Sequence, residues 1–183
     1  MKKITLLFIL TCFTFSLNGQ KVDSFISQDG SQIFFQEFGD TGETIVLLSG
    51  GPGLNPYYLE PLYNELKKKY RCILLHQRGT GKSILNEINE ESINVQKYID
   101  DLNGLYKKLG NEKLILVGHS WGGMLSFSYA ANEPDKIKKV ILLNTGGVSD
   151  EFYKWFGSNI NMRLYPEDIK LRIEQNENNG GTA

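Results

Sequence analysis

The hydrophobic positions of this chain fall into short runs that alternate with amphipathic stretches. Four nearly continuous apolar runs stand out in the sequence: Thr44–Leu48, Cys72–Leu75, Leu114–Val117 and Val140–Leu143. Runs of this length without polar alternation are typical of parallel strands that are buried on both faces of a sheet. The pattern therefore predicts a parallel sheet with helices on both sides.

Helical periodicity fills much of the sequence between these runs. The predicted helices are Tyr57–Tyr70, Val95–Leu109 and Trp121–Asn132. Tyr58, Leu62 and Leu66 recur at four-residue spacing in the first, with Lys67–Lys69 in its last turn, and Gly110 ends the second.

A hairpin is expected ahead of this alternation. Val22–Gln28 and Gln32–Phe38 predict two strands on either side of the turn Asp29-Gly30. Strands that alternate with helices after a hairpin indicate an α/β fold with a mostly parallel sheet flanked by helices. The alternation stops after Asn144, and Ser149–Glu177 is expected to be helical and amphipathic.

The amino terminus has a different pattern. Lys2 and Lys3 precede an uncharged, mostly apolar run over residues 4–17. That run is shorter than the roughly 20 apolar residues that span a bilayer, so stable membrane insertion is not expected. Its charge-then-apolar order predicts a signal peptide over residues 1–19 and a protein exported to the periplasm or secreted. An uncleaved membrane anchor is the alternative, and a lipid anchor at Cys12 fits the sequence less well.

Composition and charge narrow the possible partners. The chain has 183 residues, of which 40% are hydrophobic and 22% charged, as in ordinary globular proteins. Without the leader, 18 basic residues face 21 acidic ones, a balance of −3, so nucleic acid is not an expected partner. Two histidines and, beyond the leader, the single Cys72 form no ligand cluster. Neither a metal nor another cofactor is therefore expected, nor an internal disulfide.

A serine nucleophile is the chemistry that the sequence supports best. The sequence GHSWGG at residues 118–123 directly follows the apolar run Leu114–Val117 and opens a predicted helix. A serine hydroxyl must be exposed and activated to attack, and a sharp strand-to-helix turn with flanking glycines exposes it. The G-x-S-x-G pattern alone is weak, and a plain glycine turn is the alternative. Its position between a strand and a helix favours Ser120 as the nucleophile.

A second glycine-rich turn can supply an oxyanion hole. The sequence SGGPG at residues 49–53 follows the apolar run Thr44–Leu48. Such a turn can aim a backbone N–H at a developing oxyanion, with the N–H of Trp121 as the second donor. A simple strand-to-helix connection would also be rich in Gly and Pro. The agreement in order and spacing with the serine turn favours the functional interpretation.

Together these motifs resemble those of the proline iminopeptidases. The motifs are GGPG at residues 50–53, QRGTGKS at residues 77–83 and GHSWGG at residues 118–123. Proline iminopeptidases are α/β-hydrolase-fold serine aminopeptidases that remove an N-terminal residue, often proline. The resemblance covers roughly residues 30–147. It implies that Gly51 and Trp121 supply the oxyanion-hole amides and that Ser120 attacks the substrate.

Two positions depart from the pattern of that family. Ser49 stands where the family usually has His, and His76 stands where it has Asp. Ser49 should matter little if backbone amides stabilise the oxyanion. The role of His76 stays open.

The end of the second motif is similar to a phosphate-binding P-loop. The P-loop needs a glycine five residues before Gly81, where this chain has His76, and a helix should follow, whereas residues 84–92 are polar and broken. We reject the nucleotide-binding hypothesis.

The base that should activate Ser120 is harder to find. His119 is beside the serine, so its side chain should point away from the hydroxyl. His76 ends a strand that should lie two strand spacings, ~10 Å, from the serine strand. Each histidine is therefore expected to be structural or supporting rather than the base.

The order of the triad residues along the chain explains why no base is found. In this fold the triad follows the order serine, acid, histidine, so we expect the acid and the histidine beyond Ala183. Residues 20–147 are then the amino-terminal part of an α/β-hydrolase core, and residues 148–183 are the start of a helical cap, truncated. Asp150 and Asp168 are poor candidates for the acid.

The leading hypothesis is a serine hydrolase that acts on a small peptide, amide or ester. By resemblance it is a peptidase that releases N-terminal residues through a Ser120 acyl-enzyme, inactive as this fragment. One alternative is an esterase or another small ester or amide hydrolase of the same fold. Another is a non-catalytic binding protein on a hydrolase scaffold.

Overall fold

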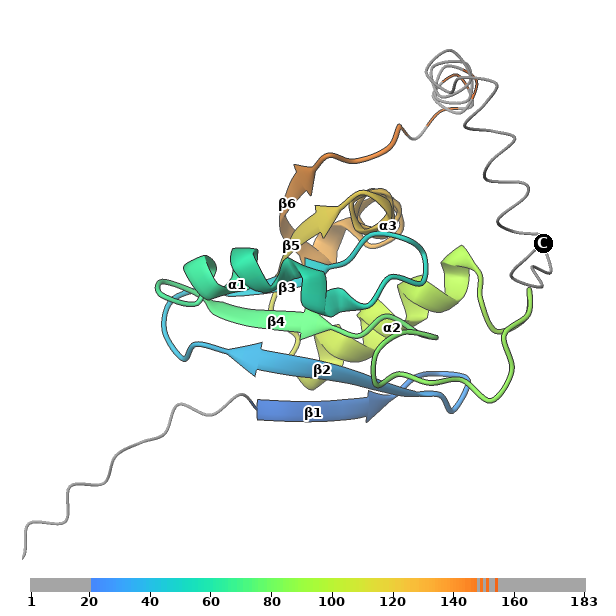
Figure 1. The fold of residues 1–183 in the computed structure, drawn as a ribbon, viewed down its shortest axis with the longest axis horizontal. Coiled ribbons are helices and arrows are strands. Elements are labelled where there is room, and N and C mark those ends of the chain that lie inside the picture. The colour runs from blue at the N-terminus through green and yellow to red at the C-terminus, as the bar shows by residue number, and fades with distance from the viewer. Residues whose placement is uncertain (1–20, 148, 150, 152–153, 155–183) are drawn as a thin grey trace, which may run out of the picture.

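A six-stranded sheet forms the centre of the computed structural model, which describes residues 21–147, 149, 151 and 154 (Figure 1). The strands are β1 (Lys21–Ile26), β2 (Gln32–Phe38), β3 (Thr44–Leu48), β4 (Arg71–Leu75), β5 (Leu114–His119) and β6 (Ile137–Leu143). They lie in the order β1-β2-β4-β3-β5-β6. β1 and β2 pair antiparallel with their neighbours, and β4, β3, β5 and β6 pair parallel with one another. The predicted mostly parallel sheet is confirmed.

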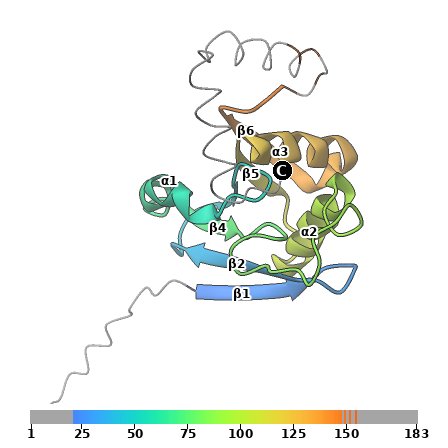
Figure 2. The ribbon, with the colours of Figure 1, turned by 45° about the vertical axis from the view of Figure 1, so that its right-hand side comes forward.

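Helices cover both faces of this sheet. They are α1 (Glu60–Leu66), α2 (Val95–Lys108) and α3 (Trp121–Asn132), with short 3-10 turns at Pro56–Leu59 and Pro134–Lys136. α1 lies on one side, and α2 and α3 lie on the other (Figure 2). Among the described residues, no helix is long and apolar enough to cross a bilayer. The predicted signal peptide over residues 1–19 lies outside the described residues. The predicted cap over residues 148–183 also lies outside them, except for residues 149, 151 and 154.

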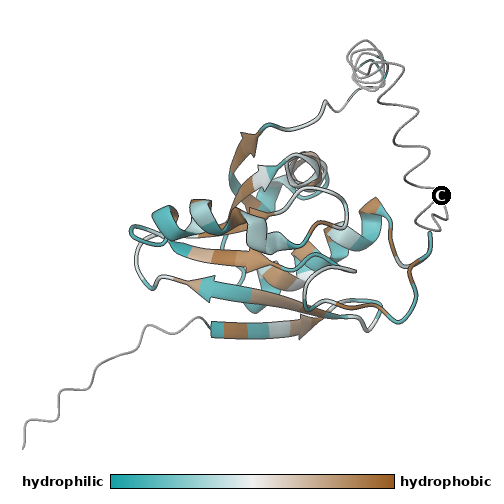
Figure 3. Cartoon of the chain, viewed as in Figure 1, coloured by the Kyte–Doolittle hydropathy of each residue, from teal (hydrophilic) through white to brown (hydrophobic). Residues whose placement is uncertain are grey.

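Alternate residues of the central strands supply two cores. Val46 and Leu48 face α2 and α3, whereas Ile45 and Leu47 face α1. Figure 3 shows these apolar strands at the centre, with polar residues on α1 and α2. Because both faces are covered, the strands need no polar alternation, which explains the continuous apolar runs of the sequence.

The stretch predicted as one helix, Tyr57–Tyr70, has a different form. It starts with a 3-10 turn over Pro56–Leu59, and α1 covers only Glu60–Leu66. Pro61 has no N–H to donate and is tolerated only in the first turn of a helix, so α1 begins just before it. Tyr58 therefore lies in the 3-10 turn outside α1, and the predicted helical spacing with Leu62 and Leu66 does not extend to it. Lys67–Lys69 follow the helix instead of forming its last turn.

A buried ion pair joins the loop after β4 to α2. The fully buried guanidinium of Arg78 donates to both carboxylate oxygens of Asp101, at 2.8 and 2.7 Å. It also donates to Asp29 at 3.0 Å and to the Ser92 carbonyl at 2.8 Å. Burial alone would raise the pKa of Asp29, but hydrogen bonds from Arg78 and other donors hold that pKa well below its ordinary value. One side chain thus connects the β1–β2 turn, the β4 loop and α2.

Replacement of Arg78 by Met should lower the free energy of unfolding by about 3–5 kcal/mol, because it leaves Asp101 buried without its partner. Urea unfolding measures this loss. Lys68→Met is the matched control: its pair with Glu65 is exposed, and its loss should cost less than about 1 kcal/mol. Asp101→Asn added to Arg78→Met should restore part of the stability, because no unpaired charge then stays buried. Equal stability of Arg78→Met and the wild type would contradict this account.

Candidate active site

Ser120 lies at the sharp turn between β5 and α3. Its backbone has φ of +52° and ψ of −117°, a conformation that side-chain-bearing residues rarely adopt. Its carbonyl accepts hydrogen bonds from the N–H groups of Gly123 and Met124, at 3.0 and 3.3 Å, so the helix begins directly behind it. Its own N–H donates to the Leu143 carbonyl at 3.0 Å. Strain of this kind at a strand-to-helix turn is typical of a nucleophile elbow.

Two glycines allow this turn to close. A Cβ on Gly118 would collide with the Gly122 carbonyl, and a Cβ on Gly122 would collide with the Leu48 carbonyl. Leu48 pairs with Gly118 in the parallel register of β3 and β5. The start of α3 therefore packs directly against the backbone of β3, and the loops after β3 and β5 begin side by side.

The glycine-rich loop after β3 reaches Ser120 through Gly50. A Cβ built on Gly50 would lie only 3.1 Å from the Cβ of Ser120. Gly51, the predicted oxyanion donor, follows with φ of +116°. Trp121 is the first residue of α3, where the N–H has no intrahelical partner. The fold thus brings together the segments that carry Gly51, Ser120 and Trp121, and their catalytic roles stay predictions.

Tyr58 joins the two turns through its hydroxyl, a contact that the sequence analysis missed. The hydroxyl accepts a hydrogen bond from the Gly50 N–H at 2.6 Å and lies 2.7 Å from Nδ1 of His119. The Tyr58 and His119 rings meet edge to face, with centroids 5.5 Å apart. Pro56 is the sequence feature that could have indicated this contact. It starts the 3-10 turn that directs Tyr58 toward the site.

His76 has a structural role in the loop after β4. The side chain is fully buried, and its Nδ1 accepts a hydrogen bond from the Lys82 N–H at 3.0 Å. Gly81 packs on the ring so closely that a Cβ there would collide with Nδ1. Burial, with a further effect of the Lys82 charge, lowers the pKa of His76 to about 4, so the ring is neutral at pH 7. A neutral imidazole nitrogen therefore accepts the hydrogen bond that closes this loop.

The buried His76 should make stability depend on pH between about 4 and 6.5. Unfolded chains take up the imidazole proton near pH 6.5, whereas the folded protein takes it up near pH 4. Between these values the unfolded state binds more protons, so the free energy of unfolding falls as pH falls, by up to about 3 kcal/mol for this group. Urea unfolding across this range should show a weaker pH dependence in His76→Asn than in the wild type. Identical pH dependence in both proteins would contradict this assignment.

The only cysteine in the described part of the chain is not a candidate nucleophile. Cys72 is fully buried in β4, and burial raises the pKa of its thiol to about 11. A buried thiol with a raised pKa is inert. Cys72 is therefore excluded as a nucleophile, and Ser120 stays the candidate.

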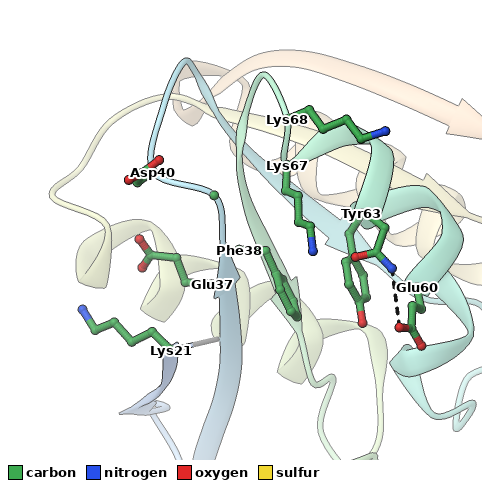
Figure 4. A pocket seen from close by; sticks show the side chains of 10 residues that line it. Lys21, Glu37, Phe38, Asp40, Glu60, Tyr63, Lys67 and Lys68 are labelled. Carbon is green, nitrogen blue, oxygen red and sulfur yellow. Dashed lines mark hydrogen bonds between the residues drawn. The ribbon is translucent and has the colours of Figure 1, made fainter. Parts of the chain in front are cut away.

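A separate hollow of about 620 Å³ lies between β2 and α1 (Figure 4). Phe38 stacks on Tyr63 in its wall, and Glu37 pairs with Arg71 beside it. Antiparallel β2 finishes where parallel β4 begins, so the hollow is at the opposite end of the sheet from Ser120, which follows the end of β5. It is not part of the candidate active site.

Comparison with known proteins identifies the family. Residues 43–170 match the alpha/beta hydrolase fold family. The chain belongs to this family, in agreement with its sheet order and with the turn at Ser120.

Individual relatives carry different names. The chain is 35% identical over 123 residues to the cis-3-alkyl-4-alkyloxetan-2-one decarboxylase of Shewanella oneidensis, which covers 67% of this chain and 38% of the relative. It is 28% identical over 162 residues to a proline iminopeptidase of Heyndrickxia coagulans, covering 87% of this chain and 55% of the relative. The crystal structure of a serine hydrolase from Cycloclasticus zankles superposes with a TM-score of 0.64 at 26% identity, covering 74% of this chain and 53% of that one.

These similarities confirm the resemblance to proline iminopeptidases and the α/β-hydrolase fold. The chain spans about half, or less, of the length of these relatives. Because a decarboxylase and a peptidase are both among them, the comparisons define the family and not one reaction.

Proposed function

We propose that the protein is a serine hydrolase that releases N-terminal residues from small peptides, with Ser120 as the nucleophile. One observation carries the proposal: Ser120 is held at φ of +52° in the β5–α3 turn. The glycine-rich loop in contact with it and the proline iminopeptidases among the relatives support the proposal.

In this reaction the Ser120 hydroxyl oxygen attacks the carbonyl carbon of the substrate and gives its proton to a base. The N–H groups of Gly51 and Trp121 stabilise the negative charge on the carbonyl oxygen. The C–N bond then breaks as the amine takes up a proton and leaves. Water hydrolyses the acyl-enzyme and returns a proton to the serine.

We assign the base of this reaction to neither histidine of the chain. Nδ1 of His119 lies 2.7 Å from the Tyr58 hydroxyl, and His76 is fully buried in the β4 loop. In this proposal the acid and the histidine of the triad come from a longer form of the protein. The 183-residue chain alone should therefore barely hydrolyse a proline-linked chromogenic amide. Brisk turnover that disappears in Ser120→Ala would show that this account of the base is wrong.

A fluorophosphonate probe should form a covalent bond with Ser120, because the oxyanion donors assist attack on phosphorus as they assist attack on a carbonyl. Mass spectrometry of the labelled peptide locates the adduct. Ser120→Ala should abolish labelling, whereas Ser128→Ala, two turns further along α3, should retain it. If Ser120 is not labelled even in a form that carries a triad histidine, the protein is better explained as a non-catalytic binding protein.

The substrate class needs a separate measurement. With such a form, kcat/KM for prolyl and other aminoacyl amides should exceed that for simple esters after correction for the intrinsic reactivity of each bond. Faster corrected turnover of the simple esters would favour the esterase alternative.

A further inference from the structure

Gln77 reaches both turns that surround Ser120. It lies in the loop after β4, and its side chain is almost fully buried. In the sheet β4 lies next to β3, and β3 lies next to β5. A side chain just after β4 can therefore contact the loop after β3 and, across it, the start of α3. This residue belongs to the second motif of the chain, to which the proposed reaction gives no role.

Three hydrogen bonds engage the Gln77 amide. Its Nε2 donates to the Ser49 carbonyl at 2.8 Å and to the Ser49 hydroxyl at 3.1 Å. Its Oε1 accepts from the indole N–H of Trp121 at 3.1 Å. A carbonyl can only accept and an indole N–H can only donate, so these partners allow one orientation of the amide.

The contact with Ser49 fixes a peptide unit next to the oxyanion hole. The Ser49 carbonyl and the Gly50 N–H belong to the same peptide plane, which Gln77 binds on one side and Tyr58 on the other. The next peptide carries the N–H of Gly51. Two successive glycines have little conformational preference of their own, so contacts from outside the loop must set the direction of that N–H.

The contact with Trp121 restrains the residue that carries the second predicted oxyanion donor. Its indole is held by Gln77 on one side and packs edge to face on Tyr98, with ring centroids 5.5 Å apart. The backbone N–H of the same residue is the other predicted oxyanion donor. One amide thus connects Trp121, which carries one donor, with Ser49, which lies two residues before Gly51.

Gln77 itself is held rigidly. Its carbonyl accepts from both the N–H and the hydroxyl of Thr80, at 2.9 and 2.7 Å. The residues on either side, His76 and Arg78, are buried and hydrogen-bonded. The backbone around Gln77 is therefore rigid enough to hold the side-chain amide in a fixed position.

We propose that Gln77 is a positioning residue of the oxyanion hole, which sets the spacing between the Gly50–Gly51 loop and Trp121 without touching the substrate. This role rests on the proposed function of Ser120. Loss of one oxyanion donor typically lowers the rate 10²- to 10³-fold, and loss of its positioning should lower the rate roughly 10- to 100-fold.

Gln77→Met tests the role with a side chain of similar size and no hydrogen bonds. The maximal rate of fluorophosphonate labelling at Ser120 should fall roughly 10- to 100-fold, with the probe concentration for half-maximal rate changed less than about twofold. Tyr129→Phe is the control, because it removes a buried side-chain hydrogen bond, to Asn103 at 3.0 Å, away from the site. That variant should label at the wild-type rate. Equal labelling rates in Gln77→Met and the control would overturn the proposal.

Gln77→Glu adds a pH signature that a purely structural role would not produce. A protonated Glu can donate to the Ser49 carbonyl and accept from Trp121 as the amide does, whereas an ionised Glu turns a negative oxygen toward that carbonyl. The labelling rate relative to wild type should therefore fall as pH rises and the carboxyl ionises. A ratio that stays constant across the ionisation of the Glu carboxyl, followed by NMR in the same variant, would contradict the positioning role.

Amide hydrogen exchange keeps the two proposals distinguishable. Gln77→Met should speed exchange in residues 49–55 and at the Trp121 indole N–H, and Tyr129→Phe should not. If Ser120 is not labelled in a form that carries a triad histidine, the proposed function fails, and unchanged exchange in Gln77→Met would overturn the positioning role independently.

Discussion

The parallel pairing of β3 with β5 is the constraint on which the candidate active site depends. Leu48 stands opposite Gly118, so the two segments that leave these strands start at the same edge of the sheet. α3 can begin there only because Gly122 has no Cβ to meet the Leu48 carbonyl. The chain must therefore change from strand to helix at Ser120, in a conformation that costs about 1–3 kcal/mol. Leu125 and Tyr129 of α3, both buried against the sheet, offset that cost.

Three consecutive polar residues after β4 support this edge from the side. His76 closes its own loop, Gln77 contacts the two turns around Ser120, and Arg78 binds Asp101 of α2. All three are buried, and burial of polar groups is tolerated only when they are hydrogen-bonded. The outer two fix the backbone on both sides of Gln77. The QRGTGKS motif therefore holds Gln77 in place and does not bind a phosphate. His76 stands at the position where a P-loop needs a glycine.

The strands and the serine turn could be predicted because their signals are local. Continuous apolar runs such as Thr44–Leu48 follow from burial on both faces, and the glycines of the GHSWGG turn follow from its tight geometry. The helix over Tyr57–Tyr70 was predicted too long because periodicity outweighed the effect of Pro61. The contacts of Tyr58 and Gln77 could not be predicted, because they join residues 61, 28 and 44 positions apart in the chain. Only the order of the strands brings such residues together.

Stability and reaction rate depend on different parts of this structure. A hydrogen bond of the Gln77 or Tyr58 type contributes about 1 kcal/mol to folding, much less than the buried side chains of the two cores. The same bond can control the direction of an oxyanion donor, and one donor is worth about 3–4 kcal/mol in the transition state. The glycine-rich loop is too flexible to set that direction alone. Polar contacts with little weight in folding can therefore have a large weight in catalysis, and at this site they converge on the loop that touches Ser120.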